Sequence, residues 1–249
     1  MKRIRSLISI ILTVALLLLS FPGYSPQVWA EGPIQIDNVF VERTDNELLE
    51  TVNGVIEIDG SGLKDALVLV RTTAGGGSKI LGKEMGQRLA NEDTYLKFQL
   101  TGAEMKSILL SDGIKIGTVS VAVDDSNFAT ISSVEPKVVN MGASTQLTIR
   151  GSNLNNDNLT FGKGSFNGGS INRTFDTITI SNLSGDTGFH DIIFTRVRED
   201  VANVSGKVTL RRLYQNQFRA VQQRNFAGLE MYPNKGVAGQ TIVYFQAPH

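Results

Sequence analysis

Histidines, serines and acidic residues are the side chains of this sequence that could do chemistry. The two histidines, His190 and His249, lack the paired spacing of a transition-metal site. His190 falls in an expected strand, where we interpret it as a partly exposed strand residue. Serines are frequent, but none sits in a Gly-x-Ser-x-Gly elbow, so no nucleophile is predicted. These residue types favour a protein that is not an enzyme.

The stretch GSKILGKE, residues 77–84, comes near a phosphate-binding loop. Gly77 is followed after four residues by Gly82 and Lys83, but Glu84 stands where that loop needs Ser or Thr. A carboxylate at this position would repel phosphate. We therefore interpret the stretch as a loop between strands, with no cofactor.

Asp124 and Asp125 are the candidate ligands for a metal ion. They lie at an expected domain junction, where calcium with its preference for hard oxygen ligands could bind. The sequence lacks the Asp-x-Asp-x-Asp-Gly spacing of a dedicated calcium loop. A solvated turn is the favoured interpretation, and calcium is the alternative.

The elements that must position these residues are revealed by a repeat. The segment from Ile56 to Leu63 aligns with the segment from Leu147 to Leu154, and both read as alternating strands that end in Gly-Ser-x-Leu. A third, partial copy begins near Leu229. The separation of the copies is that of whole domains, since solenoid repeats are shorter. Many further short strands follow, separated by turn residues, and the segment 102–113 predicts one short helix.

The second copy resembles the IPT/TIG domain. The resemblance rests on Pro136, Gly142, TQLTIRGSNL, NLTFG and ITISNLSGDTGFHDIIF, and it covers about 129–212. The first copy, about 33–125, is a looser match with a longer middle. The resemblance implies an immunoglobulin-like β-sandwich of the E-set type, which is common in cell-surface and secreted proteins. The predicted fold class is therefore all-β, with tandem immunoglobulin-like β-sandwiches.

The expected organisation has five parts. They are a signal peptide at 1–30, a looser immunoglobulin/IPT-like sandwich at 31–127, an IPT/TIG sandwich at 128–213, a linker at 214–227 and an incomplete third repeat at 228–249.

The first 30 residues have the pattern of a cleaved secretory signal. Lys2, Arg3 and Arg5 precede an apolar run that is too short for a membrane span. The 24 basic and 24 acidic residues of the chain become a mildly acidic balance once these three are removed, so nucleic acid is not an expected partner. The signal and the absence of cysteine favour a bacterial protein that is secreted or held at the cell surface.

These features predict an exported scaffold, spacer or adhesion protein that binds through inter-strand loops. The expected partners are a cell-wall or extracellular protein or polysaccharide, or further copies of the module, without a membrane span after signal cleavage. The alternative is an accessory, carbohydrate-binding part of a secreted polysaccharide-acting enzyme whose catalytic domain is absent from this chain. The candidate binding-loop residues are Gly75, Gly76, Gly77, Ser152, Asn153, Asn155, Asn156 and Asp157.

Overall fold

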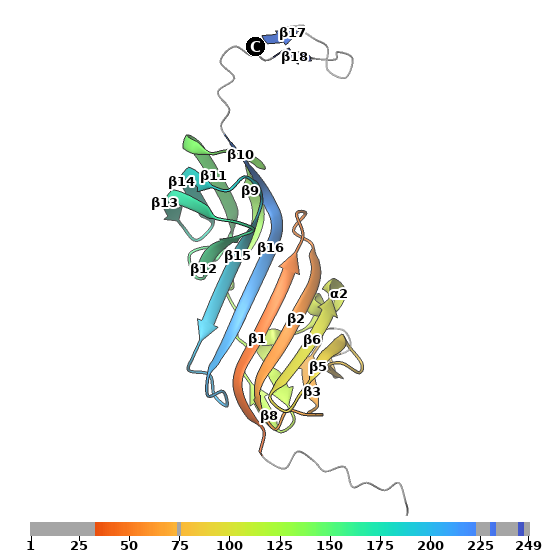
Figure 1. The fold of residues 1–249 in the computed structure, drawn as a ribbon. Helices are drawn as coiled ribbons and strands as arrows, with labels where there is room; N and C mark the ends of the chain where they lie inside the picture. Colours follow the sequence, from red (N-terminus) through yellow and green to blue (C-terminus); the bar gives the residue numbers. More distant parts are fainter. Residues whose placement is uncertain (1–32, 74–75, 223–229, 233–243, 247–249) are drawn as a thin grey trace, which may run out of the picture.

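The computed structural model describes residues 33–73, 76–222, 230–232 and 244–246. The expected signal peptide and most of the expected third repeat lie outside these residues. Most of these residues lie in β-strands, and helix is confined to two short segments, which confirms the all-β prediction (Figure 1).

The first sandwich is built from eight strands in two sheets. One sheet has the order β1-β2-β6-β5 and the other β4-β3-β7-β8. The strands are β1 (Gln35–Asp45), β2 (Thr51–Ser61), β3 (Val68–Arg71), β4 (Ser78–Ile80), β5 (Gln87–Asn91), β6 (Tyr95–Thr101), β7 (Ile114–Ile116) and β8 (Val119–Val121).

The second sandwich also has two four-stranded layers, in the orders β13-β14-β11-β9 and β12-β15-β16-β10. Its strands are β9 (Thr130–Glu135), β10 (Val138–Asn140), β11 (Gly142–Ser152), β12 (Asn158–Gly162), β13 (Phe166–Arg173), β14 (Thr177–Gly185), β15 (Gly188–Arg198) and β16 (Lys207–Val221). Two short strands, β17 (Glu230–Tyr232) and β18 (Tyr244–Gln246), pair with each other.

Strand order identifies both sandwiches as immunoglobulin-like. In each, the first, second, fourth and fifth principal strands form one sheet, and the third, sixth and seventh form the other, as in the ABED and CFG sheets of immunoglobulin domains. The first strand of the second sandwich switches sheets at Pro136, between β9 and β10. Pro136 thus divides the first strand in two.

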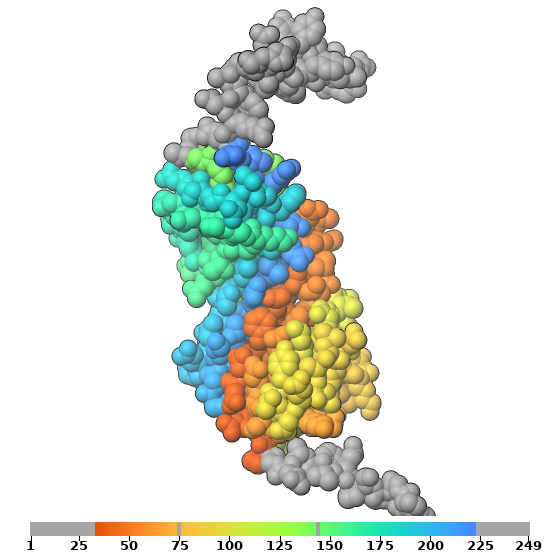
Figure 2. Space-filling view, in the orientation of Figure 1, coloured from red at the N-terminus to blue at the C-terminus, as the bar shows by residue number. Residues whose placement is uncertain are grey.

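The two sandwiches share one sheet. β1 of the first sandwich pairs in parallel with β16 of the second, from Asn38 opposite Lys207 to Asp45 opposite Tyr214. This joins the layers of both sandwiches into one sheet with the order β12-β15-β16-β1-β2-β6-β5. Figure 2 shows the result as one elongated body, in which β1 and β16 meet along its middle. We call the paired strands β1 and β16 the seam.

β16 corrects the expected domain boundary at residue 213. The segment 214–227 was expected to be a linker, but it is strand through Val221, and Tyr214 and Phe218 are buried in the core of the second sandwich. At its other end, Val208 and Leu210 pack in the core of the first sandwich. One strand therefore serves two cores.

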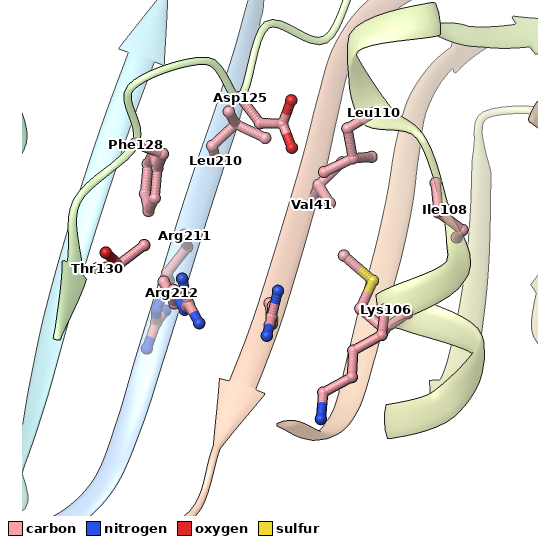
Figure 3. Close-up of a pocket in the computed structure, with 12 residues that line it drawn as sticks. Val41, Lys106, Ile108, Leu110, Asp125, Phe128, Thr130, Leu210, Arg211 and Arg212 are labelled. Atoms are coloured by element: carbon pink, nitrogen blue, oxygen red, sulfur yellow. The ribbon is translucent and has the colours of Figure 1, made fainter. Parts of the chain in front are cut away.

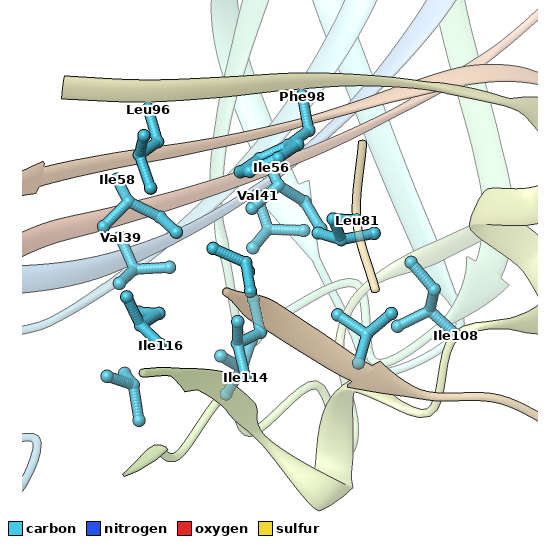
Figure 4. Packing of buried hydrophobic residues seen from close by; sticks show 14 of the residues in the cluster. Val39, Val41, Ile56, Ile58, Leu81, Leu96, Phe98, Ile108, Ile114 and Ile116 are labelled. Carbon is cyan, nitrogen blue, oxygen red and sulfur yellow. The ribbon is translucent and has the colours of Figure 1, made fainter. Parts of the chain in front are cut away.

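The core of the first sandwich lies between its two sheets. Val39, Ile56 and Phe98 from the shared sheet face Ile114 and Ile116 from the other sheet (Figure 4). All five are fully buried. Alternation along β1 and β2 places Glu42, Glu57 and Asp59 on the opposite face of the shared sheet.

The short helix α2 (Gly102–Ser107) follows β6 and covers one end of this core. Thr101 accepts a hydrogen bond from the Glu104 backbone N–H, and the Glu104 carboxylate accepts one from the Thr101 backbone, which makes a capping box. A 3-10 turn, η1 (Leu110–Asp112), comes next. No helix in the described ranges has the length and apolar character of a membrane span.

Candidate functional site

An ion cluster lies on the seam. Arg43 of β1 is paired with Arg212 of β16, and both donate to the Asp45 carboxylate. Arg43 Nε is 3.2 Å from Asp45 Oδ1, and Arg212 Nε is 2.8 Å from Asp45 Oδ2. The Asp45 side chain is 0% exposed, whereas those of Arg43 and Arg212 are 31% and 15% exposed. One buried carboxylate thus serves two guanidinium groups.

Positive charge exceeds negative charge in this cluster. Burial lowers the pKa of Arg43, and the adjacent positive charge of Arg212 lowers it further. The Arg212 guanidinium also lies over the Tyr214 ring, 5.0 Å from its centre. An arginine stays charged in proteins even when its pKa falls, so the cluster keeps a surplus cation.

Tyr214 connects the cluster to the second sandwich. Its hydroxyl oxygen accepts a hydrogen bond of 3.0 Å from the backbone N–H of Ile131. Burial raises the pKa of Tyr214 to about 12. The phenol is therefore neutral at physiological pH and acts as a fixed hydrogen-bonding group.

Above the cluster is a cavity of about 290 Å³ between the two sandwiches (Figure 3). Its floor is the seam. One wall is α2 and the turn after it, with Lys106, Ile108 and Leu110; the opposite wall is the connector between the sandwiches, with Asp125 and Phe128. We call this cavity the seam cleft. Charged groups lie on its floor and rim, and apolar side chains lie on both walls.

The connector, residues 122–129, is fixed by Arg196. The Arg196 guanidinium donates to the backbone oxygens of Ser126 and Asn127 and pairs with Asp157 at 2.7 Å. It also lies 5.1 Å from the centre of the Phe128 ring. The wall of the seam cleft that carries Phe128 is thereby held against the second sandwich.

The repeated Gly-Ser-x-Leu motif performs the same task in both sandwiches. Gly60 and Leu63 donate backbone hydrogen bonds to Thr94 and Asp93, and Gly151 and Leu154 donate the equivalent bonds to Asp176 and Phe175. Leu63 and Leu154 are both fully buried. The motif anchors the end of the second strand to the turn across the sandwich, so it is a fold motif.

The predicted binding loop at 152–157 is tied into this framework. Ser152 Oγ lies 2.7 Å from Thr130 Oγ1, and Asn153 adopts a positive φ of 56°. Asp157 is buried, pairs with Arg196 and accepts a 2.7 Å hydrogen bond from the Ala129 N–H, so its carboxylate serves the fold. Asn155 and Asn156 are exposed.

The glycine-rich loop belongs to the other sandwich. Gly76 and Gly77 lie between β3 and β4 and are exposed, whereas Gly75 is outside the described residues. Downstream, the Glu84 carboxylate accepts a 2.8 Å hydrogen bond from the Ile80 N–H. The stretch that approaches a phosphate-loop spacing thus forms β4 and the turn after it.

The two calcium candidates, Asp124 and Asp125, have different neighbours. Asp124 accepts hydrogen bonds from the Ser126 N–H and from Arg198 Nη1, the latter at 2.8 Å. Asp125 is exposed at the rim of the seam cleft, where partial loss of hydration raises the pKa of its carboxyl. In the described part of the chain, no group of three or more acidic or histidine residues is placed to hold a metal ion.

His190 is fully buried, so the expectation of a partly exposed strand residue was wrong. Its ring stacks on Phe218 with 5.3 Å between centres and lies 5.1 Å from Phe166. Nε2 is 2.9 Å from the Asp186 carbonyl oxygen. The imidazole is a member of the second core.

The alternation of residues along β1 already indicates the seam cluster in the sequence. In β1, Arg43 and Asp45 continue the inward-facing series of Val39 and Val41. Charged residues at inward positions indicate a buried partner or a site. What the sequence did not reveal was the partner strand, because β1 pairs with a strand from the far end of the chain.

No protein-family model matches the chain, and no curated protein matches it. Solved structures that share some likeness include titin Ig tandem domains A164-A165, with 11% identity, coverage of 77% of this chain and 97% of that one, and a TM-score of 0.22. A complex of Dpr2 Ig1-Ig2 with DIP-Theta Ig1-Ig3 gives 11% identity, coverage of 77% and 100%, and a TM-score of 0.26. DIP-gamma IG1+IG2 gives 11% identity, coverage of 74% and 97%, and a TM-score of 0.23. At these values the fold assignment rests on strand order within the chain itself.

Proposed function

We propose that this chain is a non-enzymatic, exported binding scaffold that works as a rigid pair of immunoglobulin-like modules. The observation that carries the proposal is the seam. Modules joined only by a linker move relative to each other by default. Here, backbone pairing from Asn38–Lys207 to Asp45–Tyr214 makes the two modules share a sheet. In a spacer or adhesion protein, such a shared sheet would hold the contact surfaces of the two modules in fixed positions.

Several contacts beside the backbone support rigidity at the junction. Asp45 binds cations from both seam strands. Gln217 of β16 is buried and donates 2.9 Å to the Asn46 carbonyl at the tip of the β1–β2 hairpin. Arg196 fixes the connector. Together these contacts hold the chain where tandem modules usually bend.

Retention on insoluble material tests the proposed role. The purified chain is incubated with isolated bacterial cell walls and, separately, with insoluble polysaccharides, and the bound fraction is measured after sedimentation. We expect saturable retention on at least one of them, which heat-denatured chain does not show. Absence of retention on all of them, or release of soluble sugar from a polysaccharide, would contradict a binding scaffold without catalytic activity.

A further inference from the structure

The seam cleft carries an uncompensated positive charge. Its lining includes Arg43, Arg212 and Lys106 as cations, and Arg211, which is paired with Glu42 at 3.0 Å. Against the first three stand two carboxylates, Asp45 beneath the floor and Asp125 on the rim. With all of them ionised, three cations face two anions, and one positive charge remains.

Arg43 lines the seam cleft and has donors that its bond to Asp45 leaves unused. Arg43 uses Nε for Asp45, and in the described part of the chain its two terminal nitrogens have no protein partner. Lys106 is exposed and forms no ion pair within the described ranges. A purely structural role in fixing the seam explains why both arginines bond to Asp45. It does not explain why the two terminal nitrogens of Arg43, which could bind both oxygens of one carboxylate, remain unused.

The walls add an apolar component. Phe128 on the connector faces Ile108 and Leu110 across the cavity, above Val41 and Leu210 on the floor (Figure 3). A volume of about 290 Å³ is near the lower limit for small-molecule sites, about 300–1,000 Å³. Apolar walls with a few convergent charged groups are the composition of such sites.

We propose that the seam cleft binds a monocarboxylate with an apolar body. The carboxylate would accept hydrogen bonds from the terminal nitrogens of Arg43 with Lys106 beside it, and the apolar body would lie between Phe128 and Leu110. The single negative charge of a monocarboxylate balances the one uncompensated positive charge of the cleft. A doubly charged phosphate group would exceed it and would face Asp125. The inference rests on the proposed binding role and adds the class of ligand.

Two sources can supply this chemistry. One is a free aryl or alkyl carboxylate, and the other is the carboxyl terminus of a partner chain that ends in an apolar residue. Calorimetric titration of the purified chain distinguishes them. The probes are 3-phenylpropanoate, its neutral amide, phenyl phosphate, and the peptide Gly-Gly-Phe with either a free or an amidated carboxyl terminus.

We expect 3-phenylpropanoate to bind and its amide to bind at least about ten-fold more weakly, because the charge-assisted hydrogen bonds are lost. Tighter binding of the free-terminus peptide than of 3-phenylpropanoate identifies a partner chain as the source, and the reverse order identifies a free carboxylate. Arg43→Gln should weaken binding by about ten-fold, since Arg212 still satisfies Asp45 and the fold is retained.

Lys106→Gln is the second variant, because Lys106 is exposed and its loss leaves the fold unchanged; we expect about three-fold weaker binding. Arg71→Gln is the matched control, since Arg71 pairs with Asp112 outside the seam cleft. The inference is overturned if no carboxylate binds with a Kd below about 10 mM, if the amide or phenyl phosphate binds as well as the acid, or if Arg43→Gln and Arg71→Gln behave alike. If none of the probes binds but the chain is still retained on cell walls, the carboxylate proposal is wrong and the proposed scaffold function stands.

Discussion

At the scale of single residues, the repeated glycine of the Gly-Ser-x-Leu motif is explained by close approach of backbone. A Cβ on Gly60 would overlap the Gln35 carbonyl oxygen, and a Cβ on Gly151 would overlap the Thr130 carbonyl oxygen. We expect Gly60→Ala and Gly151→Ala each to lower the free energy of unfolding by about 1–3 kcal/mol, the usual cost of overpacking. Urea denaturation followed by circular dichroism measures this loss.

Gly77→Ala is the control for both variants, because a Cβ there meets no atom within 4 Å. It should change stability by less than about 0.5 kcal/mol. Equal effects of all three substitutions would show that the motif glycines have no special role.

Tyr214 gives a prediction about alkaline pH. Its pKa is raised to about 12 in the folded chain, mainly by burial, and an unfolded tyrosine titrates near 10. Its contribution to stability is therefore fully present below about pH 10 and is lost as pH rises toward about 12. In Tyr214→Phe, the free energy of unfolding should fall less between about pH 10 and 12 than it does in the native chain.

At pH 7, Tyr214→Phe should lower the free energy of unfolding by about 1–3 kcal/mol, because the Ile131 N–H loses its buried acceptor. Unfolding free energies at pH 7, 10 and 11.5 test both statements; a parallel alkaline loss in the variant would contradict the first.

Asp124 allows a test of the calcium alternative. Its carboxylate already accepts from Ser126 and pairs with Arg198, so recruiting it to a metal ion would cost those bonds. We expect millimolar calcium or a chelator to leave the melting temperature unchanged. A rise of several degrees with calcium, abolished by Asp125→Asn, would restore the site.

At the scale of elements, the helix α2 depends on Glu104. Its carboxylate accepts from the Gly86 N–H at 2.8 Å and from the Thr101 N–H at 2.8 Å, and these two bonds hold the pKa of Glu104 below its ordinary value. A lowered pKa means that the stabilisation is present above about pH 4.3 and is lost as pH falls through the folded pKa. Glu104→Gln should therefore destabilise by roughly 1 kcal/mol at pH 7 and by less near pH 3. A difference that stays constant with pH would show that the charge is not involved.

The same scale shows which elements a sequence can predict. The alternation of β2 and β11 and their shared ending are local, so the repeat predicted two matching strands in matching sandwiches. β16 was assigned in part to a linker because its second half is rich in glutamine. One of these glutamines bonds to a distant part of the chain: Gln217 Nε2 donates to the Asn46 carbonyl of the first sandwich. Local composition cannot reveal a partner so far along the chain.

At the scale of the whole molecule, the seam decides whether the two sandwiches behave as one body. Strand alternation could place Arg43 and Asp45 on an inward face, but the cluster exists only because β16 of the second sandwich pairs with β1 of the first. The site is thus a property of the joined sandwiches. Either sandwich alone would lack one of the two arginines that bind Asp45.

Cooperative unfolding follows from this arrangement. Val208 and Leu210 of β16 belong to the first core, while Tyr214 and Phe218 belong to the second, so neither core can lose β16 without the other. We expect one calorimetric transition for the chain, with equal calorimetric and van't Hoff enthalpies.

Asp45→Asn removes the buried anion between two guanidinium groups and should lower the free energy of unfolding by about 3–5 kcal/mol, because it leaves uncompensated charge on the seam. The single transition should move to lower temperature as a whole. Asp112→Asn, which breaks the exposed pair with Arg71, is the control and should shift it little. Two separate transitions in the native chain, or a shift confined to one of two transitions in Asp45→Asn, would show that the modules unfold independently and that the seam does not make them rigid.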